Sequence, residues 1–372
     1  MNAGAVHGPA AIANGAGGFV IDTIEVAAPM PGEVRVRLAA AGLCHTDYAS
    51  LKWPGPLVMG HEGAGHIEAV GEGVTHLTRG MAVLLNWAIP CGACPQCGRG
   101  EDSLCDRTHE TDPARFGTSR VHRGATRWQG AAIDRSFHLG TFAKYTLVRA
   151  EAVTPLPGWF PPEQACVLGC AVMTGIGSAI NVARVAPGDS VAVIGCGGVG
   201  LNVVRGAAIA GAGRIIAIDR NRQGLDRAAS MGATDLLLVD DADDGGAALT
   251  ERVRALTDRQ GVDHAFEATG VAALAFLPLR LARNGGNALQ VSGAHGQVEV
   301  AMTDLFWNKR YVTPLYGGCV PARDFPRLFD WVEQGEIDLG ALISREYSLD
   351  CLDDAIGDML AGRTAKGVIR IG

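Results

Sequence analysis

Apolar residues in the second half of the chain occur in short continuous runs, separated by longer amphipathic segments. Runs of this length predict buried strands, and the segments between them have the periodicity of helices. The expected strands lie at 191–195, 214–219, 236–239, 264–268 and 288–292. The expected helices lie at 195–211, 221–231 and 248–259. Because strands with helices on both faces are apolar throughout, this alternation predicts a doubly wound α/β domain with a parallel sheet of six strands.

The first half of the chain has a different pattern, with short segments such as 33–40 and 66–70 among many glycines and prolines. We expect a β-rich domain here. Near the C-terminus, segments 322–335 and 352–361 predict helices, and 367–371 predicts a last strand that returns to the first domain. The predicted domains are a β-rich domain of residues 1–171 and 316–372 and an α/β domain of residues 172–315.

The composition supports this division and restricts the partners. A chain of 372 residues is longer than one hydrophobic core usually serves. Its 48% hydrophobic and 19% charged residues are typical of a packed globular protein, and its net charge of -7 disfavours nucleic acid or anionic membranes as partners. Residues 1–20 lack the features of a leader, and no apolar run is long enough to span a membrane. We therefore expect a soluble, cytoplasmic protein.

Four of the ten cysteines lie close together in a polar, glycine-containing segment, residues 91–105. They form the pattern C-x2-C-x2-C-x7-C, with Cys91, Cys94, Cys97 and Cys105. Four thiolates in a turn-rich loop can surround Zn²⁺ tetrahedrally and leave no open position, which predicts a structural zinc site. A zinc ribbon that binds nucleic acid is the alternative use of this pattern, but the acidic charge balance disfavours it.

Three further candidate ligands are scattered through the β-rich region: Cys44 in GLCHTD, His61 in GHEGAG and Cys170 in LGCAVMTG. Each alone is compatible with ordinary packing. Together, two thiolates and one imidazole leave a fourth position for water or a substrate oxygen, as catalytic zinc requires. Asp47 is expected to hydrogen-bond the free nitrogen of His61, and Glu62 to act as a movable carboxylate at the same metal.

A G-x-G-x-x-G pattern follows the first predicted strand of the α/β domain and opens a helix, as in the Rossmann fold. The residues expected to face a pyrophosphate are Gly195, Gly197, Gly198, Val199 and Gly200. Asp219 ends the next strand, where its carboxylate would accept hydrogen bonds from the adenosine ribose and repel a 2′-phosphate. This favours NAD over NADP, although Arg220 would soften the preference.

Taken in order, GLCHTD, GHEGAGHIEAVGEGV, the four-cysteine lobe, GTFAKYTLV, GCAVMTG and GCGGVG resemble the medium-chain zinc-dependent alcohol dehydrogenase family over essentially the whole chain. The resemblance includes its class III, aryl-alcohol and NAD-retaining bacterial branches. It implies a GroES-like catalytic domain beside the Rossmann domain, two zinc ions per subunit, NAD, and a homodimer or homotetramer. It also implies that Cys44, His61, Cys170 and Glu62 belong to the catalytic zinc site and the cysteine lobe to the structural one.

The resemblance implies further roles. His45 and Arg370 would contact the pyrophosphate, and Thr174 would also contact the cofactor. With zinc holding the alcohol oxygen and nicotinamide taking the hydride, Thr46 would relay the proton to the nicotinamide ribose. Some relatives finish this relay with a histidine where this chain has Ala49, so we expect the proton to leave through water or another group.

Trp87 and, more weakly, Trp53 are candidates for the substrate pocket, which suggests small apolar or aromatic primary alcohols or the corresponding aldehydes. S-(hydroxymethyl)glutathione dehydrogenase is an alternative. Two departures weaken it: SLKWPGPLVM replaces an acidic stretch, and His109 stands in place of an arginine. An NADP-linked aldehyde reductase of the same fold is also compatible with these motifs. A catalytically inactive zinc- and dinucleotide-binding protein is disfavoured, because the ligand set is intact.

The segment 106–140 is rich in arginine, with Arg115, Arg120, Arg123, Arg127 and Arg135. Such a segment is compatible with a solvated loop or with steering of an anionic substrate. Together with the HLGTFAKY that ends and follows it, the segment resembles bacterial relatives that hold NAD tightly and recycle it without release.

Overall fold

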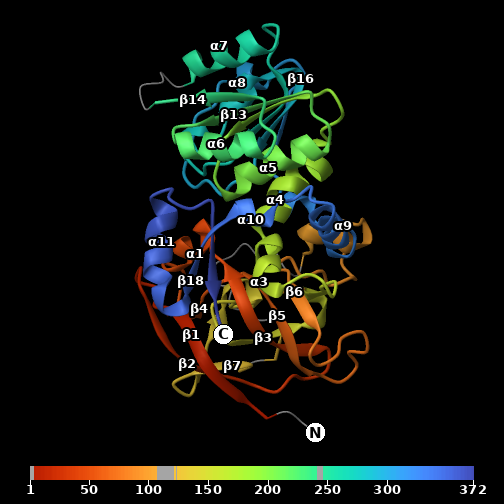
Figure 1. The fold of residues 1–372 in the computed structure, drawn as a ribbon, viewed down its shortest axis with the longest axis vertical. Coiled ribbons are helices and arrows are strands. Elements are labelled where there is room, and N and C mark those ends of the chain that lie inside the picture. Colours follow the sequence, from red (N-terminus) through yellow and green to blue (C-terminus); the bar gives the residue numbers. More distant parts are fainter. Residues whose placement is uncertain (1–3, 107–120, 123, 241–245) are drawn as a thin grey trace. The chain divides into compact units, whose positions relative to one another are not determined.

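The computed structural model describes residues 4–106, 121–122, 124–240 and 246–372 (Figure 1). The chain forms two compact units, Met1–Cys170 with Val320–Gly372, and Ala171–Cys319. The domain boundaries predicted from the sequence, after residues 171 and 315, lie close to the divisions after Cys170 and Cys319. His109, Arg115, Arg120 and Arg123 lie outside the described residues.

The unit of residues 171–319 contains the predicted parallel sheet, in the order β14-β13-β12-β15-β16-β17. The strands are β12 (Ser190–Ile194), β13 (Arg214–Asp219), β14 (Asp235–Leu238), β15 (Val262–Glu267), β16 (Ala282–Gln290) and β17 (Arg310–Val312). One face of the sheet buries a core that includes Ile194, Ile216, Ile218, Val253 and Leu281. The structure thus confirms the predicted six-stranded α/β architecture.

The helices of this unit are α4 (Ala171–Gly177), α5 (Gly198–Ile209), α6 (Arg222–Ser230), α7 (Ala247–Leu256) and α8 (Leu277–Leu281). Helix α5 begins three residues later than predicted, because Gly195 at φ +94° turns the chain sharply before the helix can start. Helix α6 begins after Asn221, whose side chain accepts a hydrogen bond from the Gln223 N–H at 2.9 Å. Both helices therefore start directly after a strand's carboxyl end.

The other unit is built on two sheets, in the orders β8-β7-β2-β1-β4-β9 and β11-β6-β5-β3-β19-β18, with β10 also paired to β3. Strands of the first sheet are β1 (Val6–Ala13), β2 (Phe19–Val26), β4 (Leu57–Val58), β7 (Thr126–Trp128), β8 (Ala131–Ala132) and β9 (Asp134–Arg135). Strands of the second are β3 (Glu33–Gly42), β5 (Glu62–Val70), β6 (Ala82–Leu85), β10 (Tyr145–Arg149), β11 (Val153–Pro155), β18 (Ile343–Ser348) and β19 (Lys366–Arg370).

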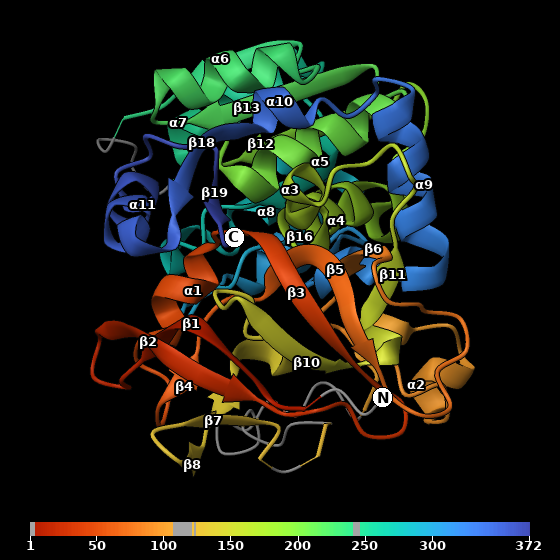
Figure 2. The same cartoon turned by 60° about the horizontal axis from the view of Figure 1, so that its bottom comes forward.

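The last strand returns to the first domain, as predicted. Figure 2 shows β19 beside β3, with which it pairs in antiparallel register, Ile369 opposite Ala41. The helices of this unit are α1 (His45–Ser50), α2 (Pro95–Gly98), α3 (Pro162–Ala165), α9 (Pro321–Glu333), α10 (Leu339–Leu342) and α11 (Leu352–Leu360). The C-terminal segment is therefore an integral part of the β-rich unit.

Two further predictions, on the basic segment and on membrane-spanning segments, can be compared with the structure. Arg135, which the sequence placed in a solvated basic segment, is 3% exposed, and its guanidinium donates to the Leu147 carbonyl. Burial lowers the pKa of Arg135 to about 10. Within the described ranges no single helix meets the length and hydropathy needed to cross a membrane; one bent pair, 162–169 with 171–183, meets them jointly by length and composition alone.

Candidate functional site

Four metal-binding side chains meet at one end of β5. Cys44 precedes α1, His61 and Glu62 lie at the start of β5, and Cys170 follows the 3₁₀ turn Cys166–Gly169. One ligand atom from each of the four lies within 4.8 Å of the others. Pairing of β3 with β5, which sets Gly42 opposite Glu62, brings the segments of Cys44 and His61 together.

Asp47 hydrogen-bonds two of these residues, His61 and Cys44. Its carboxylate is fully buried, with Oδ1 2.8 Å from His61 Nδ1 and Oδ2 accepting the Cys44 N–H at 2.9 Å. Because Nδ1 is engaged by the carboxylate, Nε2 is the imidazole nitrogen left for a metal. The position of Asp47 agrees with the orienting role expected from the sequence.

A buried lysine, which the sequence analysis did not single out, lies against Glu62. The Lys366 ammonium donates to Glu62 Oε1 at 2.5 Å and to the Leu43 carbonyl at 2.8 Å, and both charged side chains are almost completely buried. The second carboxylate oxygen, Oε2, is buried without a hydrogen-bond partner. A Cβ at Gly42 would lie 2.1 Å from that oxygen, so glycine is needed to leave room for the carboxylate.

The electrostatics of this cluster suit a cation. The hydrogen bond between the sulfurs of Cys170 and Cys44 lowers the pKa of Cys44 and raises that of Cys170. Burial disfavours the charged imidazole, but Asp47 outweighs it and raises the pKa of His61. Burial also raises the pKa of Glu62 to about 7. Two sulfurs, one imidazole and an unpartnered carboxylate oxygen form a donor set that fits Zn²⁺.

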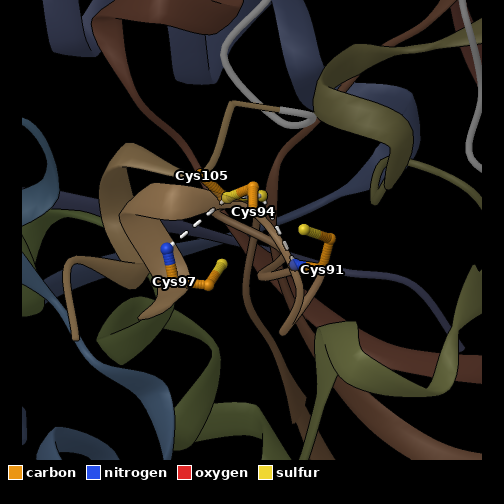
Figure 3. A group of neighbouring side chains, drawn as sticks. All are labelled: Cys91, Cys94, Cys97 and Cys105. Atoms are coloured by element: carbon orange, nitrogen blue, oxygen red, sulfur yellow. Dashed lines mark hydrogen bonds between the residues drawn. The ribbon is translucent and has the colours of Figure 1, made fainter. Parts of the chain in front are cut away.

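The four cysteines of the lobe also converge (Figure 3). Their sulfurs lie within 4.8 Å of one another, and all four are free thiols. The Sγ atoms of Cys94 and Cys105 are 3.9 Å apart, and backbone N–H groups of Cys97 and Cys91 point at them from 3.5 and 3.3 Å. Such N–H donors stabilise thiolates, so the lobe is preformed for a closed tetrahedral ion.

The glycine turn after β12, residues 195–200, is tightly packed. A Cβ at Gly200 would lie 1.8 Å from the Gly195 carbonyl oxygen, so only glycine fits where the helix approaches the strand. Asp219 holds this turn: its Oδ2 accepts the Cys196 N–H at 2.6 Å, and Oδ1 accepts the Asn221 N–H at 2.7 Å. A cavity of about 690 Å³ lies beside the residues that follow Asp219. Its lining residues are Arg220, Asn221, Arg222, Leu238, Val239 and Asp240.

An aromatic cluster contacts the ring of His61 through its central residue, Phe137, which the sequence analysis did not identify. The ring of Phe137 lies 4.9 Å from His61, 5.2 Å from Trp87 and 5.6 Å from Trp53, measured between centroids. Phe137 adopts a left-handed conformation, with φ +51°. No motif marks Phe137, because its neighbours in this cluster come from distant parts of the sequence. The two predicted pocket tryptophans are thus joined through a third aromatic residue.

The remaining candidates lie in varied surroundings. Thr46 Oγ1 is 3.7 Å from Cys44 Sγ, whereas His45 and Ala49 are exposed on α1. Thr174 is buried in α4 of the other unit. Arg370 is engaged in ion pairs with glutamates, 2.9 Å from Glu346 and 3.9 Å from Glu163.

Comparison with known proteins identifies the family. The alcohol dehydrogenase GroES-like domain matches residues 30–158, and the zinc-binding dehydrogenase domain matches residues 198–334. An S-(hydroxymethyl)glutathione dehydrogenase of Escherichia coli is 35% identical over 357 residues, covering 93% of this chain and 95% of the relative.

Two solved structures are similar to this protein, and each match covers 99% of this chain and 100% of the chain in the solved structure. An alcohol dehydrogenase zinc-binding domain protein from Burkholderia ambifaria has a TM-score of 0.90 at 31% identity. Benzyl alcohol dehydrogenase from Acinetobacter calcoaceticus has a TM-score of 0.88 at 29% identity. The similarity spans both units and both cysteine-containing sites, and the chain belongs to the medium-chain zinc-dependent alcohol dehydrogenase family.

Proposed function

We propose that this protein is an NAD-linked, zinc-dependent dehydrogenase that interconverts aromatic primary alcohols and aldehydes. The observation that carries the proposal is the cluster of Trp53, Trp87 and Phe137, in which the ring of Phe137 packs against the ring of His61. Aromatic walls beside a reacting centre favour flat apolar substrates through stacking and edge contacts. The likeness to benzyl alcohol dehydrogenase points in the same direction.

In this proposal Cys44, His61 and Cys170 hold the catalytic zinc, with Glu62 as an additional oxygen donor. When bound, zinc supplies a Lewis acid for the alcohol oxygen, and the nicotinamide of NAD accepts the hydride. Asp47 engages Nδ1 of His61 and so leaves Nε2 as the nitrogen that would bind the metal. The four lobe cysteines hold a second, structural zinc ion.

Thr46 is the proposed first acceptor of the alcohol proton, since its hydroxyl lies 3.7 Å from the sulfur of Cys44. Ala49, a helix turn further on, carries no group that can take the proton onward. The proton therefore reaches solvent through water or through hydroxyls of the cofactor in our proposal.

The choice of NAD rests on Asp219. Two backbone N–H groups fix its carboxylate, and each oxygen keeps a lone pair for a ribose hydroxyl. Its charge repels a 2′-phosphate. Arg220 and Arg222, which line the cavity beside the residues that follow Asp219, would attract such a phosphate. Comparing kcat/KM for NAD and NADP decides between the two; a preference for NADP would overturn this part of the proposal. His45, Thr174 and Arg370 remain proposed cofactor contacts.

The second candidate is oxidation of S-(hydroxymethyl)glutathione, which the names of the 35% identical relatives favour. A glutathione adduct is bulky and anionic, and needs cationic anchors near the zinc. The aromatic side chains of Trp53, Trp87 and Phe137 offer none. A panel of benzyl alcohol, ethanol and S-(hydroxymethyl)glutathione, with zinc content measured in parallel, separates the candidates. We expect the highest kcat/KM with benzyl alcohol and two zinc ions per chain; higher kcat/KM with the glutathione adduct would reverse the assignment.

Phe137→Ala tests the aromatic wall directly. We expect kcat/KM for benzyl alcohol to fall about ten-fold, while that for ethanol changes little, because only the larger substrate uses the ring. Phe276→Ala is the matched control, since Phe276 packs on Tyr311 in the other unit at 4.7 Å. Equal losses on both alcohols would remove Phe137 from the selection of substrate.

We also propose a homo-oligomer, as the family resemblance implied. The supporting feature is β17, which ends its sheet and is flanked in the sequence by exposed apolar side chains.

A further inference from the structure

A buried carboxylate lies at the carboxyl end of β15 and accepts an unusual number of hydrogen bonds. Glu267 is fully buried. One oxygen accepts the N–H of Thr269 at 2.6 Å and also its hydroxyl. The other accepts from Gln290 Nε2 at 2.5 Å, Ser292 Oγ at 2.8 Å and the Gly270 N–H at 3.4 Å. Within the described ranges no salt bridge reaches Glu267, so these five neutral donors satisfy its buried oxygens.

The network lies where the sheet changes direction. From β12 the chain proceeds outward through β13 and β14, then returns to place β15 on the other side of β12. Glu267 is opposite Ile194, the last residue of β12, which directly precedes the glycine turn. Crevices at such switch points, outside the carboxyl ends of parallel strands, are where doubly wound folds bind dinucleotides.

The loop held by Glu267 packs directly on the glycine turn. The Ala268 N–H donates to the Ile194 carbonyl at 2.8 Å. A Cβ at Gly195 would lie 2.7 Å from Thr269 Cγ2, and one at Gly200 would lie 3.3 Å from Ala268 Cβ. A displacement of residues 268–269 therefore displaces the turn whose N–H groups face the pyrophosphate.

We propose that Glu267 is a positioning residue of the dinucleotide site. Its carboxylate joins the loop after β15 to the loop after β16 and sets the shape of the crevice against which the cofactor binds. An amide in its place has one acceptor oxygen and an NH₂ group that would face the amide nitrogen of Gln290. This inference rests on the proposed use of NAD and extends it to a residue that does not touch the cofactor.

The test is Glu267→Gln in the zinc-loaded enzyme. We expect the Kd for NADH, measured by protein-to-NADH fluorescence transfer, to rise about ten-fold, with KM for NAD rising in parallel and kcat changing less. Backbone amides of residues 269–271 should exchange hydrogen faster, and the zinc content should stay the same. Glu251→Gln is the control, because this glutamate is exposed on α7 and pairs with the surface arginines Arg254 and Arg259.

A second substitution distinguishes positioning from general damage. Adding Gln290→Glu to Glu267→Gln restores one carboxylate and one amide to the pair, with donor and acceptor exchanged. We expect the double variant to recover at least half of the lost NADH affinity. Recovery supports the inference; a double variant as weak as the single one overturns it.

Two further outcomes are decisive. An unchanged Kd and unchanged exchange in a folded Glu267→Gln overturn the inference while leaving the proposed function intact, whereas a wild-type protein that binds no dinucleotide overturns the proposed function itself. Where Glu267→Gln does not fold, Thr269→Val takes its place, since it removes one donor and keeps the shape. A two- to five-fold weaker Kd then supports the inference, and an unchanged Kd overturns it.

Discussion

The buried ion pair of Lys366 with Glu62 joins the last strand, β19, to the candidate catalytic zinc site. The two charges are 2.5 Å apart and shielded from water. Burial disfavours the charged ammonium, but the nearby carboxylate outweighs it and raises the pKa of Lys366, while burial raises that of Glu62. Each charge is thus tolerated only because the other is present.

Lys366→Met should therefore lower the free energy of unfolding by about 3–5 kcal/mol, because it leaves the Glu62 carboxylate buried without its partner. Urea unfolding of the zinc-loaded protein measures the loss. Combining Lys366→Met with Glu62→Gln should restore part of the stability, and Lys52→Met, at an exposed lysine, should change it little. A loss below about 1 kcal/mol for Lys366→Met would mean that water reaches the pair.

At the level of single residues, the sequence predicted those side chains that stand in local motifs. Cys44, His61 and Cys170 each lie in a short glycine-containing pattern with known metal chemistry. Lys366 and Phe137 have no such pattern, because their roles arise from contacts with residues far away in the chain. A charged residue directly before the apolar core of the last strand was the available signal for Lys366.

At the level of elements, strands that are buried on both faces were predictable from the sequence. The strands β12, β13 and β15 are covered on both faces and are continuous apolar runs, so the sequence predicts them. The strands β1 and β2 were not predicted individually; β1 consists largely of small residues, and the two strands pair with each other along eight residues. Cross-strand pairing, which the local sequence does not reveal, stabilises them.

One contact between elements predicts a pH dependence. Asp358 on α11 accepts hydrogen bonds at 2.6 Å from Tyr347 and Arg345 of β18 and from Arg363. The Tyr347 hydroxyl, followed by Arg363, lowers the pKa of Asp358 below its ordinary value of 3.8. A lowered pKa in the folded state means that the contact stabilises the protein above that ordinary value, and that the stabilisation disappears as the pH falls through the folded-state pKa.

Asp358→Asn should therefore lower Tm at pH 7 by about 2–4 °C and have a diminishing effect as the pH falls below about 4. Differential scanning calorimetry of both proteins across this range checks the prediction. Asp330→Asn, at an exposed position of α9, provides the comparison. A difference in Tm that stays constant down to pH 3 would show that the charge of Asp358 does not stabilise the contact.

At the level of the whole molecule, the parallel sheet ends in a strand whose outer edge pairs with no other described strand. β17 contacts β16 on one side only. Val312 at its end and four residues that flank it in the sequence are exposed apolar side chains: Met302, Phe306, Trp307 and Leu315. Trp307 is 70% exposed and is held at φ +65°, a conformation that costs a non-glycine residue free energy. An open edge beside exposed apolar groups is a place where a second copy of the chain can pair.

A two-fold axis at this edge would set β17 against its own copy in antiparallel register and make one continuous sheet across two subunits. We therefore predict that light scattering finds at least twice the chain mass of 38.7 kDa for the wild type, and that Trp307→Glu reduces the mass, because it places a charge in the centre of the apolar contact. Trp159→Glu, at a tryptophan 44% exposed in the other unit, should keep the wild-type mass. A wild-type monomer, or an assembly that Trp307→Glu leaves intact, would place any subunit contact elsewhere. Circular dichroism of the monomeric variant should still show a folded sheet, since the sheet's apolar core lies on its faces and not at this edge.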